Sequence, residues 1–112
     1  MAAREFLEGL KSSSEVELTV MRSGRWTTRP VWFVVDGATI YLLPMYGTDT
    51  KWYKYATANP EIELSLRGSK VRGQARSVGA QQLVDVADRF RSKYGELGTY
   101  YRKLDAAIAV TI

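Results

Sequence analysis

Residues 23–60 contain the side chains whose types and spacing could bind a ligand. Residues 48–51, Thr-Asp-Thr-Lys, lie where a helix is predicted to begin, so hydroxyl groups and backbone N–H groups without helical partners converge there. Lys51 opposes the dipole of that helix unless a bound anion reverses the local balance. Arg29 and Arg25, just upstream, could complete a clamp around a phosphate. The alternative is that Lys51 is a solvated surface charge and that one of the two threonines only caps the helix.

Aromatic residues gather in the same stretch. They usually form part of a core or of a dimer interface, but their flat faces can equally bind the ring of a heteroaromatic ligand. The sequence leaves both uses open for Trp26, Trp32, Tyr46, Trp52 and Tyr53.

The chain lacks the side chains that most often perform catalysis. It contains no histidine and no cysteine. This excludes a Ser-His triad, a thiol nucleophile, a disulfide and nearly every transition-metal site within one chain. Any redox chemistry would therefore be carried by a bound cofactor, so no residue is predicted to be catalytic.

Composition places the chain among ordinary globular proteins. Its 112 residues, 46% apolar and 25% charged, fit one domain spanning residues 1–112. The net charge of +4 comes from basic residues scattered singly, whereas a nucleic-acid site usually forms a continuous stripe. Residues 1–10 resemble neither a signal peptide nor a membrane span, so we expect a cytoplasmic protein without a membrane span.

The hydrophobic pattern predicts a mainly β protein with inserted helices. We expect strands at residues 17–21, 31–35, 38–43, 61–67, 70–77 and 106–112, and helical segments at 2–10, 50–59, 80–94 and 99–104. The continuous apolar run at 31–35 is typical of a central strand covered on both faces. Hairpin turns dominate the connections, so the six strands should form an antiparallel sheet closed into a barrel or split barrel.

The order of several short motifs resembles a known family. The segments are residues 27–37 (TTRPVWFVVDG), 40–44 (IYLLP), Gly47, 51–53 (KWY) and 58–60 (ANP), with a weaker echo at 101–103 and 108–110. Together they resemble the deazaflavin (coenzyme F-420)-dependent nitroreductase family. That family belongs to the FMN-binding split-barrel superfamily, together with pyridoxamine 5′-phosphate oxidase-like proteins.

The resemblance implies a homodimer whose cofactor, coenzyme F-420 or FMN, lies at the dimer interface. A single subunit would hold half of the pocket and leave Trp32 and Trp52 partly exposed. Tyr101 would face the small-molecule redox substrate. The implied cofactor-binding residues are Ser23, Gly24, Arg25, Thr27, Arg29, Pro30, Val31, Trp32, Leu43, Pro44, Thr50, Lys51, Trp52 and Tyr53.

The arginine of the family's Ser-Gly turn segment is replaced by Thr27, with Arg29 nearby instead. This arrangement is closer to the FMN-binding members, so both cofactors remain open. The chain also lacks the C-terminal Arg-x-Pro signature of true pyridoxamine phosphate oxidases.

Three functions follow as hypotheses. The first is an oxidoreductase that reduces electron-poor molecules such as quinones or nitro compounds. The second is a module that binds or carries a flavin without turnover. The third is a nucleic-acid-binding barrel that uses the face formed by Lys70, Arg72 and Arg76, which the scattered charge disfavours.

Overall fold

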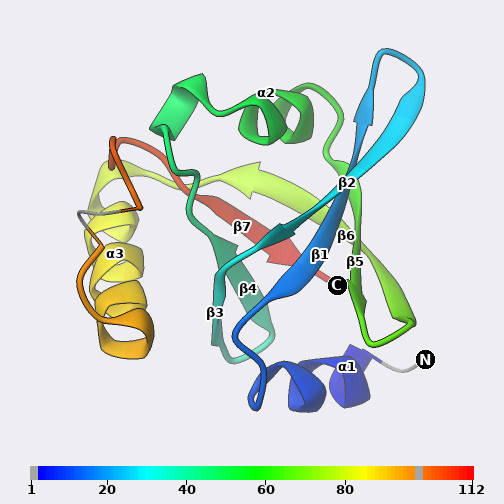
Figure 1. Ribbon diagram of the computed structural model, residues 1–112, viewed down its shortest axis with the longest axis horizontal. Coiled ribbons are helices and arrows are strands. Elements are labelled where there is room, and N and C mark those ends of the chain that lie inside the picture. The colour runs from blue at the N-terminus through cyan, green and yellow to red at the C-terminus, as the bar shows by residue number, and fades with distance from the viewer. Residues whose placement is uncertain (1–2, 98–99) are drawn as a thin grey trace.

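A computed structural model describes residues 3–97 and 100–112. Seven strands form one antiparallel sheet in the order β2-β1-β5-β6-β7-β4-β3, with three α-helices and one short 3-10 helix between them (Figure 1). The strands are β1 (Val16–Arg22), β2 (Arg25–Val31), β3 (Phe33–Asp36), β4 (Thr39–Leu42), β5 (Glu61–Leu66), β6 (Ser69–Ser77) and β7 (Ile108–Thr111). The helices are α1 (Ala3–Leu10), η1 (Gly47–Asp49), α2 (Lys51–Ala58) and α3 (Ala80–Tyr94).

The connection between β2 and β3 makes the sheet curl. These strands stand at opposite ends of the strand order, yet only Trp32 separates them in the chain. A flat seven-stranded sheet would hold its two ends far apart, because neighbouring strands are about 4.8 Å apart. The sheet therefore bends back on itself into a split barrel, which confirms the predicted fold class.

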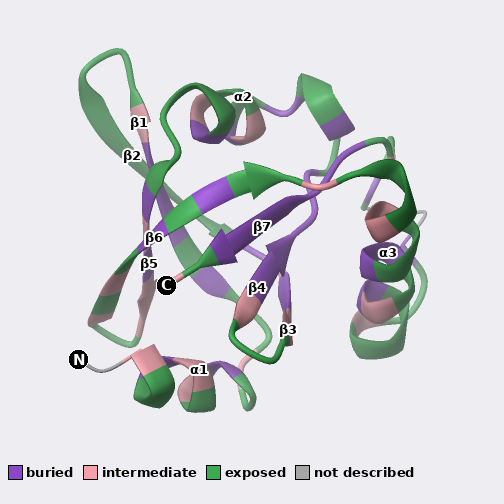
Figure 2. Cartoon of the chain, turned by 180° about the vertical axis from the view of Figure 1, so that it is seen from behind, coloured by how far each residue is buried: buried purple, intermediate pink, exposed green. Residues whose placement is uncertain are grey.

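The strand count is seven rather than six, because β2 was not predicted. Its sequence, Arg-Trp-Thr-Thr-Arg-Pro-Val, lacks the alternation of a half-buried strand, and residues 25–30 are all exposed (Figure 2). The predicted central strand at 31–35 is also wrong. Val31 ends β2, and Phe33 begins β3 at the end of the sheet.

The apolar run still reflects burial on two faces. Phe33 belongs to the core inside the curled sheet, together with residues of α1 and α2. Val34 belongs to a second core between the sheet and α3, together with Val86 and Phe90. Figure 1 shows α1 and α2 at opposite ends of the curled sheet and α3 to one side.

The three longer predicted helices are confirmed within one or two residues. The fourth is not: residues 100–104 are not helical, and Lys103 forms a β-bridge with Tyr46, while Thr99 lies outside the described residues. No helix among the described residues is long and apolar enough to cross a membrane.

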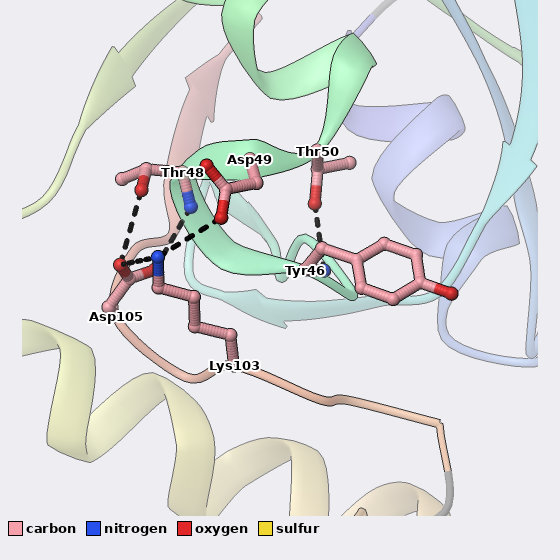
Figure 3. A network of polar contacts seen from close by, with 6 residues as sticks. All are labelled: Tyr46, Thr48, Asp49, Thr50, Lys103 and Asp105. Atoms are coloured by element: carbon pink, nitrogen blue, oxygen red, sulfur yellow. Dashed lines mark hydrogen bonds and ion pairs between the residues drawn. The ribbon is translucent and has the colours of Figure 1, made fainter.

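The loop between β4 and α2 is fastened to the segment that precedes β7 (Figure 3). Asp105 accepts hydrogen bonds from the backbone N–H and the hydroxyl group of Thr48, at 3.0 and 3.2 Å. Lys103 pairs with Asp49 at 3.2 Å and with Asp105 at 3.4 Å. Burial alone would raise the pKa of Asp105, but the hydrogen bonds from Thr48 and the charge of Lys103 lower it.

Gly47 allows this close approach. Its φ of +57° is in the left-handed region, and a β-carbon there would collide with the Asp105 carboxylate and lie 3.0 Å from the Lys103 carbonyl oxygen. Gly37 has a similar φ of +61° but nothing within 4 Å of the corresponding position.

The two glycines form a matched pair for a stability test. We expect Gly37→Ala to lower the free energy of unfolding by about 1 kcal/mol through backbone strain alone. Gly47→Ala should cost about 1–2 kcal/mol more, because it also displaces Asp105. Urea unfolding of both variants measures the difference, and equal losses would contradict a structural role for this contact.

Candidate functional site

Two hollows lie beside the bend between β2 and β3. The first, the aromatic hollow, has a volume of about 250 Å³; it is lined by Glu15, Arg29, Pro30, Val31, Trp32, Leu43, Met45, Trp52, Tyr100 and Tyr101. The second, the cationic hollow, has a volume of about 230 Å³; it is lined by Arg29, Met45, Tyr46, Asp49, Thr50, Lys51 and Trp52. Because they share Arg29, Met45 and Trp52, the two hollows form one groove.

The cationic hollow carries positive charge without a partner. Among residues 3–97 and 100–112, neither Arg29 nor Lys51 forms an ion pair. The one carboxylate that lines the hollow, Asp49, pairs with Lys103. The cationic hollow therefore presents two cations without an ion-pair partner in this part of the chain, from β2 and α2, while Glu15 lines the neighbouring aromatic hollow.

The first turn of α2 opens at this hollow. No side chain caps the helix, because the Thr50 hydroxyl instead accepts a hydrogen bond from the Tyr46 N–H at 2.8 Å. Thr48 is held by Asp105, so neither threonine supplies the cap of the alternative interpretation. The N–H groups of the first turn remain available to an anion, beside Lys51.

The aromatic hollow is walled by a cluster of rings. The Trp32 ring lies 5.1 Å from that of Tyr100 and 6.0 Å from that of Tyr101, measured between centroids. Tyr101 is buried, and burial raises the pKa of its hydroxyl group. Tyr100 is 49% exposed, so the wall opens to solvent on that side.

Of the fifteen residues implied for the cofactor and the substrate, nine line this groove and six do not. The nine are Arg29, Pro30, Val31, Trp32, Leu43, Thr50, Lys51, Trp52 and Tyr101. The six are Ser23, Gly24, Arg25, Thr27, Pro44 and Tyr53.

The six lie at identifiable places outside the hollows. Ser23 and Gly24 form the tight turn of the β1–β2 hairpin, with φ of +48° and +81°. Arg25 and Thr27 lie on β2, paired with Arg22 and Val20 of β1. The Pro44 carbonyl accepts a hydrogen bond from the Gly47 N–H, at 3.2 Å, and Tyr53 packs against the core with its hydroxyl 3.3 Å from that of Ser77.

Five further residues of the groove were not among the implied contacts: Glu15, Met45, Tyr46, Asp49 and Tyr100. Asp49 belongs to the segment 48–51 already noted at the predicted start of the helix. Tyr46 had been noted among the clustered aromatics, and Tyr100 adjoins Tyr101, so their type and position were signals. Glu15 and Met45 lie between regular elements, where periodicity carries no information.

A larger cleft, of about 650 Å³, lies between α3 and β3. Most of its charged side chains are paired: Lys11 with Glu8, at 3.0 Å, Arg89 with Asp85 and Asp36, at 3.0 and 3.3 Å, and Asp88 with Arg91, at 3.0 Å. Lys93 donates a hydrogen bond to the Phe33 carbonyl oxygen. None of its lining residues was predicted from the sequence. The smaller groove is the better candidate because it combines free charge with flat apolar surface.

The groove can bind a molecule that is anionic at one end and flat at the other. Arg29, Lys51 and the N–H groups of α2 suit a phosphate or carboxylate, whereas Trp32 and Tyr101 suit a ring. The described residues hold no group of three or more potential metal ligands.

Solved structures share the fold at low sequence identity. The structure of an F420-H2 dependent reductase is 19% identical with a TM-score of 0.70, over 87% of this chain and 93% of the other. A putative pyridoxamine 5′-phosphate oxidase from Listeria innocua is 17% identical with a TM-score of 0.72, over 97% and 91%. The heme storage protein HutZ from Vibrio cholerae is 13% identical with a TM-score of 0.75, over 96% and 87%.

These likenesses show a split-barrel fold of the pyridoxamine 5′-phosphate oxidase-like type. At 13–19% identity they leave the activity open. No curated protein matches the sequence significantly.

One family model covers nearly the whole chain. It matches residues 6–110 and is described as an uncharacterized protein conserved in bacteria, DUF2255. The match includes β1 to β6, all of β7 except Thr111, and every residue of the groove. The chain belongs to the DUF2255 family.

Proposed function

We propose that this protein is an oxidoreductase that binds a flavin-type cofactor, coenzyme F-420 or FMN, in the groove and reduces small electron-poor molecules such as quinones or nitro compounds. One observation carries the proposal. The unpaired cations Arg29 and Lys51 open onto the same groove as the ring wall of Trp32, Tyr100 and Tyr101.

The residues present fit such a cofactor. Arg29, Lys51 and the first turn of α2 would hold its phosphate, and the aromatic hollow would take a flat ring. A bound cofactor of this class supplies hydride transfer. The protein's own part is to hold the ring at a fixed angle, neutralise the anionic end and limit access of water.

The three structural likenesses differ in the ligands that their names imply. The F420-H2 dependent reductase supports a deazaflavin, while HutZ would point to heme. Heme iron is most often held by histidine or cysteine, and this sequence contains neither. A flavin-type cofactor therefore suits this chain better than heme.

We further propose that the protein acts as a homodimer. A second copy would complete the groove, whose wall opens to solvent at Tyr100, a residue that is 49% exposed. Trp52 does not need that copy for cover, because it is only 5% exposed within one chain, contrary to expectation. Trp26 on β2, by contrast, is 47% exposed.

The sheet face around Trp26 suits a second copy electrostatically. Glu17 on β1 and Glu63 on β5 line a hollow of about 350 Å³ together with Lys70 and Arg72 on β6. Within the described part of the chain, none of these four charges forms an ion pair. A two-fold axis would place Lys70 and Arg72 of one copy opposite Glu17 and Glu63 of the other.

The dimer predicts a specific effect of one substitution. At micromolar concentration the parent should sediment as a dimer, and Trp26→Ala should shift it toward monomer by removing the large exposed ring from the interface. Val84→Ala is the control, because Val84 on α3 is 63% exposed and lies away from β2. A parent protein that sediments as a monomer and still binds cofactor tightly would contradict the dimer proposal.

Lys51 should matter for binding and not for folding. We expect Lys51→Ala to weaken binding of the preferred cofactor by about 1.5–3 kcal/mol, the range for a hydrogen bond to a charged group. Lys54→Ala is the matched control, because Lys54 is exposed on the same helix but does not line the groove. Fluorescence titration of coenzyme F-420 and of FMN measures the effect.

The same titration tests whether the protein binds either cofactor at all. If neither cofactor binds the parent below millimolar concentration, the proposed function is wrong. If Lys51→Ala binds as well as Lys54→Ala, the lysine is only a surface charge. Turnover of menadione with the reduced cofactor then separates a reductase from a carrier, which would bind but not turn over.

A further inference from the structure

Trp32 occupies an unusual position in the chain. It is the single residue between β2 and β3, and its ring forms part of the wall of the aromatic hollow. Because Trp32 lies outside both strands, its backbone takes no part in the pairing that holds Val31 to β1 and Phe33 to β4. Its orientation must therefore be fixed by contacts from elsewhere.

Those contacts come from the last turn of α3. The Tyr94 ring stacks on the Trp32 ring with centroids 4.3 Å apart and planes within 6°. The Tyr94 hydroxyl accepts a hydrogen bond from the Phe33 N–H at 3.0 Å. Lys93 adds a hydrogen bond to the Phe33 carbonyl oxygen, also at 3.0 Å.

The Tyr94 hydroxyl has one proton and two acceptors within reach. They are the carbonyl oxygens of Phe33, at 2.8 Å, and Ser14, at 2.9 Å. Burial raises the pKa of Tyr94 to about 12, so the hydroxyl keeps its proton at neutral pH. One side chain thus ties the start of β3 to the loop before β1 and also backs the Trp32 ring.

Tyr94 itself does not line the aromatic hollow. Because it covers one face of Trp32, the remaining surface of that ring is what the hollow can use. The rings of Tyr100 and Tyr101 meet Trp32 at tilts of 59° and 58°. The hollow is therefore bounded by one flat wall with a rigid backing and two inclined rings.

We infer that Tyr94 is a positioning residue that holds the Trp32 ring as the flat wall of the aromatic hollow, and that the fixed orientation of this wall strengthens binding of the flat cofactor ring that the hollow takes. The ligand part of this inference rests on the proposed function. The positioning part rests on the stack and the hydrogen bonds at Phe33 alone.

Two substitutions separate the contributions of Tyr94. Tyr94→Phe removes the hydrogen bonds of the hydroxyl but keeps a ring to stack on Trp32, whereas Tyr94→Leu removes both. Tyr41→Phe is the matched control: Tyr41 is also buried, and its hydroxyl accepts a hydrogen bond from Gln82 of α3 at 2.8 Å. It lines neither hollow.

The first readout needs no ligand. In protein labelled with 5-fluorotryptophan, each of the three tryptophans gives one ¹⁹F resonance, and Trp32→Phe identifies that of Trp32. We expect Tyr94→Leu to shift and broaden the Trp32 resonance while those of Trp26 and Trp52 stay in place, with a smaller shift in Tyr94→Phe. An unmoved Trp32 resonance in both variants, as in Tyr41→Phe, would overturn the positioning role.

The second readout is the dissociation constant of the preferred cofactor. We expect it to rise about three- to tenfold in Tyr94→Leu, the size of one aromatic contact, and less in Tyr94→Phe, with no change in Tyr41→Phe. A shifted Trp32 resonance with an unchanged dissociation constant would overturn the ligand part of the inference. Failure of the parent to bind either cofactor would overturn the proposed function instead, and the ¹⁹F result would still decide the positioning role.

Discussion

The bend at Trp32 is the constraint on which the rest of the structure depends. β2 and β3 are the two ends of a seven-stranded sheet, and one residue joins them, so the intervening strands must curl. The same bend brings Arg29 and Val31 at the end of β2 next to the loop after β4 and the start of α2, where the groove forms. Fold and site thus have a common origin. The last turn of α3 protects this point by occupying the N–H and C=O groups of Phe33, which would otherwise be an open strand edge.

Electrostatics distinguish the groove from the cleft beside α3. In that cleft Arg89 pairs with Asp85 and Asp36, and the sheet face around Trp26 carries charges of both signs. At the groove, Lys51 stands against the dipole of its own helix and forms no ion pair with any residue that the structure describes. Asp49 is held by Lys103 (Figure 3). This arrangement is mildly unfavourable for the chain alone, and a bound anion would reverse that balance. The network of Thr48, Lys103 and Asp105 fixes the loop that presents Lys51, which connects the packing at Gly47 to the proposed ligand site.

Much of this architecture could be predicted from the sequence because its signals are local. The stripe of α3, the Asp36–Gly37 turn and the alternation of β5 and β6 each depend on near neighbours in the chain. β2 could not be predicted, since an exposed edge strand with Pro30 in it has no buried face to set a pattern. The division of residues 31–35 between two strands could not be predicted either. Burial on both faces produces the same apolar run in a central strand and in an edge strand covered by α3. In the site, Arg29, Trp32 and Lys51 were predicted to act together and do share a groove, whereas Glu15, Met45 and Tyr100 reach it only through tertiary contacts.

The flavin-type site is tested most directly by an amide-proton NMR titration of the protein with coenzyme F-420 and, separately, with FMN. We predict saturable shifts for at least one cofactor, largest at Arg29, Trp32, Thr50, Lys51 and Tyr101. The amides of Asp85, Asp88 and Ser92 in the α3 cleft should stay unmoved and serve as the internal reference. Shifts centred on that cleft, or no saturable shift with either cofactor, would contradict the claim that the groove beside the Trp32 bend is a flavin-type site.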